Sequence, residues 1–443
     1  MNNDITMPQY IRPGSTPKPR FLDRMAKNIM LSKLASLKHG EVHIIDSDET
    51  HHFGTQSERC SQSVQIKVRH SAFYSDIVFG GSIGAGEAYM AGFWDVDDLT
   101  GLIRIFAINQ DLMDGMEGGL AMLTRPLQKG LHWLNRNSHQ GSRKNISAHY
   151  DIGNDLFGLM LDESMMYSSA IFEHPEMSLH DAQIHRLNRI CEKLDLKPSD
   201  HLLEIGTGWG GLAIHAAKHF GCRVTTTTIS KEQYKLAKDR VRDAGLEKQI
   251  TILLEDYRNL QGQFDKLVSI EMIEAVGHQF YDTYFEQCGK LLKPNGLMLL
   301  QAITIADQRY ESAKRSVDFI QRYIFPGSCI PSVTAMLESI TRSSDMRLFH
   351  LEDIGPHYAT TLRKWEENVE ANRQAILNMG YSKEFLRMWK FYLNYCEGGF
   401  MERVIGDAHL LLMKPDNRSH DIVSLVSTSQ RPIDDEQALL GLS

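Results

Sequence analysis

Features that would place this chain in several common classes are missing from its sequence. No apolar run approaches the roughly 18 residues that a membrane-spanning helix needs. The first residues, MNNDIT, hold neither the basic nor the apolar region of a secretory signal. The six cysteines include no Cys-x-x-Cys pair, so neither a zinc site nor a disulfide framework is indicated, and no metal is predicted. We expect a cytoplasmic protein.

The sequence also lacks an excess of positive charge. Its net charge of −8 gives no support for a nucleic-acid partner. The basic residues gather instead in two islands: seven lie between Arg12 and Lys38, with Asp23 as the only acid, and five lie between Arg125 and Lys144, with no acid. Such islands suit peripheral contact with an anionic membrane surface at the inner face of the membrane. A solvated helix face or a linker is the alternative.

The length of 443 residues, of which 42% are apolar, predicts two folded units with tails. Residues 1–20 are polar, carry four prolines and are expected to form a flexible arm. Residues 21–38 place apolar side chains at helical spacing, which predicts an amphipathic helix that packs in the core or lies on a membrane. A small α+β domain is expected over 21–124, with strands near 42–46, 63–69 and 73–79 and helices near 85–91 and 98–108.

The rest of the chain has a different pattern. Residues 125–147 hold proline, glycine and the second basic island, which predicts a basic linker. Over 148–414 apolar strands alternate with helices, which predicts an α/β, Rossmann-like catalytic domain with a seven-stranded, mostly parallel sheet. Residues 415–443 are expected to form a disordered tail. The strands are placed at 201–205, 222–229, 250–254, 265–270, 296–303, 347–353 and 408–413, with helices at 178–194, 211–219, 231–244 and 279–292 and helical insertions at 309–342 and 360–404.

A glycine-rich turn follows the first of these strands. Residues 202–211 read LLEIGTGWGG, and Gly206, Gly208 and Gly210 let the backbone approach a ligand at a helix N-terminus. Dinucleotide-binding folds use a similar turn, but Glu204 would repel a pyrophosphate. The second strand also does not end in the acid that a nicotinamide ribose requires. A carboxylate at Glu204 suits the cationic amino-acid end of S-adenosylmethionine (SAM), so we predict a SAM site.

Polar residues after the next two strands complete the predicted SAM site. Hydroxyls and an amide follow the second strand and can bind ribose or carboxylate, and an acid with a neighbouring ring follows the third and can hold the adenine. These residues are Thr228, Ser230, Gln233, Asp256 and Tyr257. Trp209, inside the glycine turn, either contacts the adenosyl group or packs the turn.

Seven segments occur in a characteristic order between residues 145 and 414. They are HYDIGNDLF with MYSSAIF (149–172), LEIGTGWGG (203–211), TISKEQ (228–233), EMIEAVG (271–277), YIFPG (323–327), HYATTL (357–362) and YLNYCEGGF (392–400). Together they resemble the cyclopropane-fatty-acyl-phospholipid synthase family of SAM-dependent methyltransferases. The segment GAGEAYMAGFW (84–94) resembles that family's N-terminal domain.

The resemblance implies the transfer of a methylene group from SAM to the cis double bond of a phospholipid acyl chain. Attack of the alkene on the sulfonium methyl leaves a carbocation, which needs a dry pocket with aromatic faces or negative potential. A base then removes a proton from the transferred methyl group so that the ring closes. In this family a bound bicarbonate is the base, so bicarbonate is expected beside SAM.

The same resemblance assigns roles to individual residues. Glu274 orients the bicarbonate, Tyr358 donates its hydroxyl to it, and Ile303 contributes a backbone group. Tyr167 and Ser168 contact SAM. A further residue, Cys396, matches the cysteine long assigned to the active site, although a covalent role does not suit a reaction in which the alkene itself attacks SAM.

Two positions depart from the family pattern. Ser169 stands where many members have cysteine, and Gln301 stands where many have histidine. Both side chains can still form hydrogen bonds to an oxyanion. If the bicarbonate is lost, the carbocation can lose a different proton and give a methyl- or methylene-branched chain. A non-catalytic lipid-binding protein with a vestigial SAM fold is the alternative from another class, and a homodimer is left open.

Overall fold

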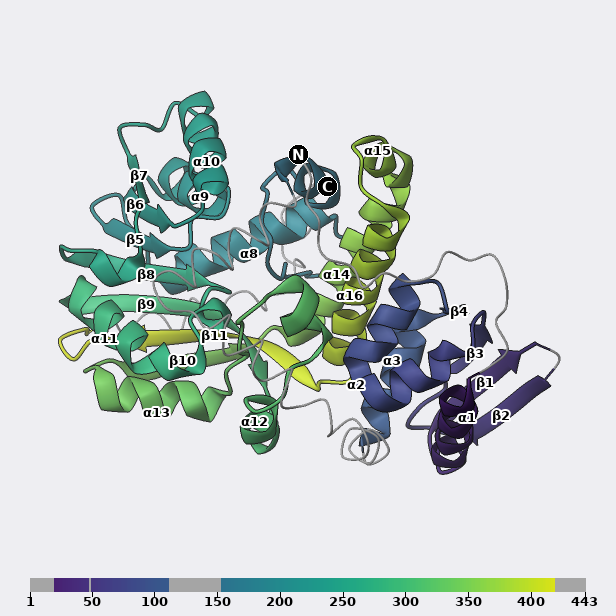
Figure 1. The fold of residues 1–443 in the computed structure, drawn as a ribbon. Helices are drawn as coiled ribbons and strands as arrows, with labels where there is room; N and C mark the ends of the chain where they lie inside the picture. The colour runs from purple at the N-terminus through teal and green to yellow at the C-terminus, as the bar shows by residue number, and fades with distance from the viewer. Residues whose placement is uncertain (1–19, 48, 111–152, 419–443) are drawn as a thin grey trace, which may run out of the picture.

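The computed structural model describes residues 20–47, 49–110 and 153–418. Two sheets lie at opposite ends of this part of the chain, and a group of helices stands between them (Figure 1). The predicted linker and the second basic island, together with most of the arm and tail, lie outside the described residues. The predicted domain limits therefore stay predictions.

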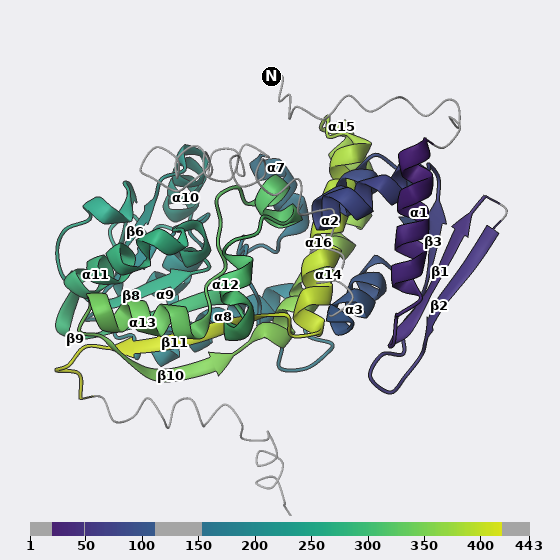
Figure 2. The same ribbon diagram turned by 60° about the horizontal axis from the view of Figure 1, so that its bottom comes forward.

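The N-terminal unit is a four-stranded sheet covered by helices. The strand order is β2-β1-β3-β4, with β1 and β3 parallel and the other two pairs antiparallel. Figure 2 shows α1 lying along this sheet, and its buried residues Met30 and Leu34 pack in one core with Ile44 and Ile66 of the strands. The elements are α1 (Phe21–Leu34), β1 (Gly40–Asp46), β2 (Glu49–Thr55), β3 (Ser63–Val68), α2 (Ala72–Met90), β4 (Trp94–Val96) and α3 (Leu99–Ile108).

One prediction in this unit is wrong. The segment 73–79, expected to be a strand, is the first half of α2, and the strand β2 was not predicted. Aromatic and β-branched residues favour strands, but Phe73, Tyr74 and Val78 lie at helical spacing and are buried together against the core. The helix bends at Gly81, whose φ of 59° interrupts the regular helical geometry.

The C-terminal part of the chain forms a seven-stranded sheet in the order β10-β11-β9-β8-β5-β6-β7. The run from β9 to β7 is parallel, whereas β11 pairs antiparallel with both of its neighbours. Each predicted strand of this domain is present, which confirms the predicted fold class. The strands are β5 (His201–Ile205), β6 (Arg223–Thr228), β7 (Ile250–Leu254), β8 (Phe264–Ile270), β9 (Leu292–Ile305), β10 (Arg347–Asp353) and β11 (Ile405–Met413).

The sheet is buried on both faces, which explains its nearly continuous apolar strands. Leu203 and Leu267 point into a core with α11 and α13, and their neighbours Leu202 and Val268 point into a second core with α8 and α9. The helices are α7 (Asn154–Met160), α8 (Leu179–Lys193), α9 (Gly211–Phe220), α10 (Lys231–Asp243), α11 (Tyr281–Leu291), α12 (Asp307–Ala313), α13 (Val333–Ser343), α14 (Gly355–Ala371), α15 (Arg373–Asn378) and α16 (Lys383–Met401). Short turns of 3-10 helix, η2 (Tyr257–Asn259), η3 (Ile273–Ala275) and η4 (His278–Phe280), and one of π-helix, η5 (Ile320–Ile324), complete the chain.

The two units share one hydrophobic core. Helix α16 lies beside α2 and α3 (Figure 1), and buried residues of all three belong to the same cluster. Polar contacts cross the same boundary: Thr100 donates a hydrogen bond to Glu397 at 2.9 Å, and Arg104 forms an ion pair with Glu402 at 2.6 Å. The helical insertions of the catalytic domain therefore hold the N-terminal unit in a defined place.

The ends of the described chain bear on two further predictions. Packing of α1 in the core confirms the core alternative for the helix, although Phe21 and Leu22 at its start are 74% and 53% exposed. At the other end, the Asn417 side chain donates to the Asn295 carbonyl at 2.7 Å, so the chain contacts the catalytic domain beyond the predicted limit at 414. Within the described residues no helix is long and apolar enough to cross a membrane.

Candidate active site

A cavity of about 740 Å³ runs through both parts of the molecule. One end lies at the glycine turn after β5, at the carboxyl ends of the parallel strands, where ligands bind in sheets of this kind. The middle passes Glu271 and Glu274, and the other end lies between α1, α2 and α3. The cavity therefore joins the predicted SAM site to the core of the N-terminal unit.

The glycine turn has the geometry that the sequence predicts. Gly206 has a φ of 104° and Gly208 a φ of 52°, both in the region that favours glycine. The N–H groups of Gly206 and Thr207 donate to the Thr227 carbonyl, which ties the turn to β6. Glu204 is buried at the end of β5, accepts a hydrogen bond from Thr226 Oγ1 at 2.5 Å and lines the cavity. Burial raises the pKa of Glu204 to about 8.

The residues that follow β6 hold one another in place. Thr228 Oγ1 donates to Gln233 Oε1 at 2.8 Å, and both residues line the cavity. Ser230 instead accepts the N–H of Gln233 and caps helix α10. Ser230 does not line the cavity. Its capping of the helix is a sufficient reason for a serine at this position, and no contact with a ligand is needed to explain it.

The residues after β7 lie at the same end of the cavity. Asp256 accepts two hydrogen bonds from the Arg258 guanidinium, at 2.8 and 2.6 Å. Tyr257 packs edge-on against Tyr284, with ring centroids 5.4 Å apart. Asp256 and Tyr257 both line the cavity, as predicted for an adenine subsite.

Three further predicted SAM residues meet beside the turn. Tyr167 lines the cavity and forms a hydrogen bond with the Tyr392 hydroxyl at 2.8 Å. Ser168 also lines the cavity, and its hydroxyl is buried with no partner among the described residues. Trp209 packs against Phe157, with ring centroids 4.8 Å apart, and contributes to the cavity wall as well. An orphaned hydroxyl is the kind of group that a bound ligand satisfies.

Glu274 lies in the middle of the cavity, on the 3-10 turn η3 after β8. Its Oε1 accepts the Ile303 N–H at 2.5 Å, and its Oε2 is buried with no partner in the part of the chain that the structure describes. Burial, with the nearby Glu271 charge, raises the pKa of Glu274 to about 8. Glu274 and Ile303 are thus brought together as predicted, but they bond to each other.

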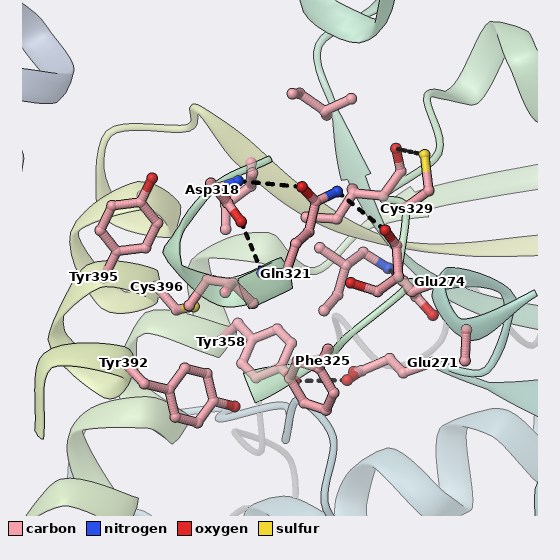
Figure 3. Close-up of a pocket in the computed structure, with 18 of the residues that line it drawn as sticks. Glu271, Glu274, Asp318, Gln321, Phe325, Cys329, Tyr358, Tyr392, Tyr395 and Cys396 are labelled. Carbon is pink, nitrogen blue, oxygen red and sulfur yellow. Dashed lines mark hydrogen bonds between the residues drawn. The ribbon is translucent and has the colours of Figure 1, made fainter. Parts of the chain in front are cut away.

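Glu271, which was not among the predicted site residues, binds the groups that were. Its Oε2 accepts the Tyr358 hydroxyl at 2.6 Å (Figure 3). Its Oε1 accepts the Ser169 N–H at 2.9 Å and Gln301 Nε2 at 2.7 Å. Neither Ser169 nor Gln301 lines the cavity. They hold the Glu271 carboxylate in place by hydrogen bonds from outside the cavity lining.

Gln301 belongs to a buried polar network on the side away from the cavity. Its Nε2 also donates to Asp407 at 2.9 Å, and its Oε1 accepts from Arg186 at 3.1 Å and contacts His409 Nε2 at 3.1 Å. All of these side chains are buried. The network fixes the amide with its nitrogen toward the carboxylates and its oxygen toward Arg186.

Aromatic rings share the middle of the cavity with the two glutamates. Figure 3 shows Tyr358, Phe325 and Tyr392 around the same space, with Cys396 on α16 beside them. Burial raises the pKa of the Cys396 thiol, so it stays protonated at neutral pH. The middle of the cavity therefore brings two acidic side chains and several aromatic rings around one space.

Comparisons with known proteins agree with this geometry. The sequence model of mycolic acid cyclopropane synthetase matches residues 137–410. The chain belongs to this family. It is 39% identical over 348 residues to the cyclopropane-fatty-acyl-phospholipid synthase of Escherichia coli, covering 78% of this chain and 86% of that one. It is 37% identical over 338 residues to the tuberculostearic acid methyltransferase UfaA1 of Mycobacterium tuberculosis, covering 72% and 76% of the two chains.

Solved structures of the mycolic acid cyclopropane synthetase family have the same fold. The crystal structure of the mycolic acid cyclopropane synthase CmaA1 complexed with SAH and CTAB is 30% identical and superposes with a TM-score of 0.58. It covers 61% of this chain and 98% of that one. The predicted family, fold and SAM-dependent methyltransferase class are thereby confirmed. The roles of individual residues stay predictions.

Sequence reasoning missed another residue besides Glu271. Arg240 of α10 donates to the Trp209 carbonyl at 2.7 Å and to the Glu163 carbonyl at 2.9 Å. Arg240 therefore links the loop before Tyr167 to the glycine turn through hydrogen bonds to both backbones. An arginine in a polar helix normally indicates a solvent-facing side chain, so the sequence held no signal for this contact.

Proposed function

We propose that this enzyme transfers a methylene group from SAM to the cis double bond of a phospholipid acyl chain and closes a cyclopropane ring. The observation that carries the proposal is the continuous cavity, which connects the glycine turn, the two glutamates and an apolar chamber. A long acyl chain can therefore pass its middle beside SAM while its end lies in the N-terminal unit.

The residues near the glycine turn fit SAM. Gly206 and Gly208 let the backbone of the turn approach closely, and Glu204 offers a carboxyl group for the cationic amino-acid end. Ser168 offers a hydroxyl that has no partner among the described residues. Asp256 and Tyr257 form the far wall, where the adenine would lie. When bound, SAM supplies an electrophilic methyl group.

The other end of the cavity fits a hydrocarbon chain. In the N-terminal unit its lining is almost entirely apolar and comes from three helices and the sheet. The residues include Met30, Ile44, Ile66, Phe73, Ile77 and Phe106. Burial of methylene groups in such a chamber contributes about 0.8 kcal/mol for each group removed from water. A lipid substrate is consistent with the family, which acts on lipids.

The middle of the cavity suits a carbocation. The alkene attacks the SAM methyl group, so positive charge develops on the neighbouring carbon of the acyl chain. The rings of Tyr358, Phe325 and Tyr392 present negative faces to this space, and Glu271 and Glu274 add negative potential. The aromatic wall also excludes water, which would otherwise add to the cation.

Expression in a bacterial strain that lacks the activity tests this function. Mass spectrometry of the fatty acid methyl esters should show a gain of one methylene group, with the hydrogenolysis behaviour of a ring. An unchanged lipid profile would contradict the proposal. If SAM affinity measured by calorimetry were also absent, a lipid-binding protein with a vestigial fold would be the better description.

A methyl- or methylene-branched product is the second candidate. It is favoured by the similarity to a relative named tuberculostearic acid methyltransferase. The same cavity and cation serve both reactions, and they differ in where the proton is lost. The mass experiment separates the two outcomes because a branched alkene and a ring respond differently to hydrogenation.

We also propose that the start of α1 contacts the membrane that holds the substrate. Phe21 and Leu22 expose apolar surface beside the exposed Arg24, an arrangement that suits an anionic bilayer. A Phe21→Ser variant should sediment less with anionic vesicles, whereas Met379→Ser, which removes an exposed residue elsewhere, should not. Equal binding by all proteins would contradict the contact. The inner-face location and the homodimer stay predictions, and analytical ultracentrifugation tests the latter.

A further inference from the structure

The resemblance to this family implies a bicarbonate base, but the residues present do not fit one. Among the donors expected to hold the anion, the Tyr358 hydroxyl donates to Glu271, and the Ile303 N–H donates to Glu274. Gln301 Nε2 is shared by Glu271 and Asp407, and the Ser169 hydroxyl donates to a backbone carbonyl. A bicarbonate would also lie between two carboxylates, and like charges repel.

Glu271 holds a backbone conformation that is unusual for its residue type. Its φ is 46°, in the left-handed region that favours glycine. Met272 and the η3 turn, which carries Glu274, follow Glu271 directly in the chain. Strained non-glycine residues of this kind cluster at functional sites, where the surrounding structure compensates for their cost. Here the compensation includes the three hydrogen bonds that the Glu271 carboxylate accepts.

We propose that the Glu271 carboxylate takes the place of bicarbonate and is the general base of the reaction. This inference rests on the proposed function, because it assigns the proton acceptor for ring closure. The carboxylate lies in the middle of the cavity, hydrogen-bonded to Tyr358 and facing the space where the alkene would lie (Figure 3). Glu274 also lines the cavity. Because Glu271 accepts the proton, Glu274 has only to stabilise the cation.

The step balances without an added ion. The π electrons of the alkene form a bond to the SAM methyl carbon, and the carbon–sulfur bond breaks to leave S-adenosylhomocysteine. Glu271 takes a proton from the transferred methyl group, and the electron pair of that carbon–hydrogen bond closes the ring. The Glu271 proton then passes to water after the product has left the cavity.

The surroundings of Glu271 support this role. Its hydrogen-bond donors hold the carboxylate in one orientation, with Gln301 itself fixed by Arg186. Burial raises the pKa of Glu271 above its usual value. A carboxylate with a raised pKa is a stronger base at neutral pH than an exposed one. Asp407 shares the Gln301 amide but does not line the cavity, so it cannot reach the substrate.

Two substitutions at one position test the inference. Glu271→Gly removes the carboxylate, suits the left-handed backbone and leaves the donors of Tyr358, Ser169 and Gln301 facing an open space. Glu271→Gln removes the charge but fills the space. Each protein is mixed with S-adenosylhomocysteine, and binding of isotopically labelled bicarbonate is followed by the broadening of its carbon resonance. Turnover is then measured in bicarbonate-free buffer and again with saturating bicarbonate.

We expect no bicarbonate binding by the wild-type enzyme and the same turnover in both buffers. Glu271→Gly should lose activity by about a hundredfold or more, bind bicarbonate and regain part of its turnover when bicarbonate is added. Glu271→Gln should be inactive in both buffers. Wild-type binding of bicarbonate, or full activity of Glu271→Gly without it, would overturn the inference. A wild-type enzyme that forms no ring in either buffer would contradict the proposed function instead. The comparison of bicarbonate binding by wild type and Glu271→Gly would still show whether the Glu271 carboxylate occupies the place of the anion.

Discussion

Gly86 of α2 lies directly against the ring of Phe319, so the catalytic domain packs a side chain on the N-terminal unit at a residue that has none. A Cβ atom at Gly86 would lie 2.3 Å from the Phe319 ring. Phe319 is fully buried and precedes the π-helical turn η5. Ile320 of this turn and Phe325, which directly follows it, line the cavity. The position of the N-terminal unit and the shape of the cavity are therefore linked through this contact.

Adding volume at Gly86 should separate the two units. Gly86→Val should lower stability by about 1–3 kcal/mol because the core has no room for the new atoms. Turnover should fall as well, since the cavity wall shifts. The control is Gly158→Ala on α7, an exposed helical position with nothing near the new methyl group. Chemical denaturation should show Gly158→Ala to be more stable than wild type, by about 0.5–1 kcal/mol. If Gly86→Val had the same denaturation midpoint as wild type, the contact between Gly86 and Phe319 would not be tight in solution.

Blocking the apolar end of the cavity should change substrate choice. Ala85 of α2 lines this end, and Ala85→Phe should fill part of it. We expect the variant to prefer shorter acyl chains, measured as the ratio of products from lipids of two chain lengths. Ala35→Phe, at an exposed position after α1, is the control and should leave the ratio unchanged. Unaltered preference in Ala85→Phe would mean that the acyl chain does not enter the N-terminal unit.

Loss of charge at Glu274 should stop the chemistry without affecting SAM binding. Glu274→Gln keeps the size of the side chain and an oxygen for the Ile303 N–H, but it cannot ionise. With a pKa of about 8, Glu274 is only partly ionised at neutral pH, and a cation that forms beside it favours the carboxylate. Turnover should be abolished, while calorimetry should give nearly the wild-type affinity for SAM. Glu286→Gln, on the exposed side of α11, serves as the matched control. Equal loss of turnover and affinity would mean that Glu274 serves SAM instead.

The thiol of Cys396 should be dispensable. Because the alkene attacks SAM directly, no cysteine nucleophile is needed, and burial keeps this thiol protonated by raising its pKa. Cys396→Ser should therefore retain most of the wild-type turnover. Cys396→Phe should lose it, because the residue lines the cavity and the larger side chain blocks the substrate. A loss in Cys396→Ser as complete as that of Glu274→Gln would argue for a chemical role.

Stability should fall in mild acid. Burial and nearby positive groups lower the pKa of His215 to about 4, and its Nε2 contacts Asn188 Oδ1 at 2.8 Å. Between its ordinary value near 6.5 and 4, the unfolded chain binds a proton that the folded chain does not, so stability decreases as the pH falls through this window. The slope from His215 reaches at most about 1.4 kcal/mol per pH unit. Urea denaturation of His215→Gln should show a shallower pH dependence than wild type, and an identical slope would contradict the assignment.

Much of the catalytic domain follows from local patterns in the sequence. The strands β5, β8, β9 and β11 are largely buried and rich in apolar residues, so each was recognisable without knowledge of its neighbours. The glycine turn marks the ligand end of β5. The N-terminal unit was harder to predict because Phe73 and Val78 carry residue types that favour strands, while their burial in α2 depends on contacts with other elements. Ser230 was placed in the SAM site from its position after a strand, but it caps α10.

The sequence by itself determined the family, the fold of the catalytic domain and the location of the predicted SAM site, because these depend on short motifs and on the period of apolar residues. Only the tertiary structure decided what surrounds each charge. Tyr358 and Glu271 are 87 positions apart in the chain, and nothing in either motif shows that the hydroxyl of one reaches the carboxylate of the other. The same holds for the cavity, which exists because helices from two separate parts of the chain pack around one space. Hydrogen bonds and cavities depend on distances between atoms, and folding brings those atoms together regardless of their order in the sequence.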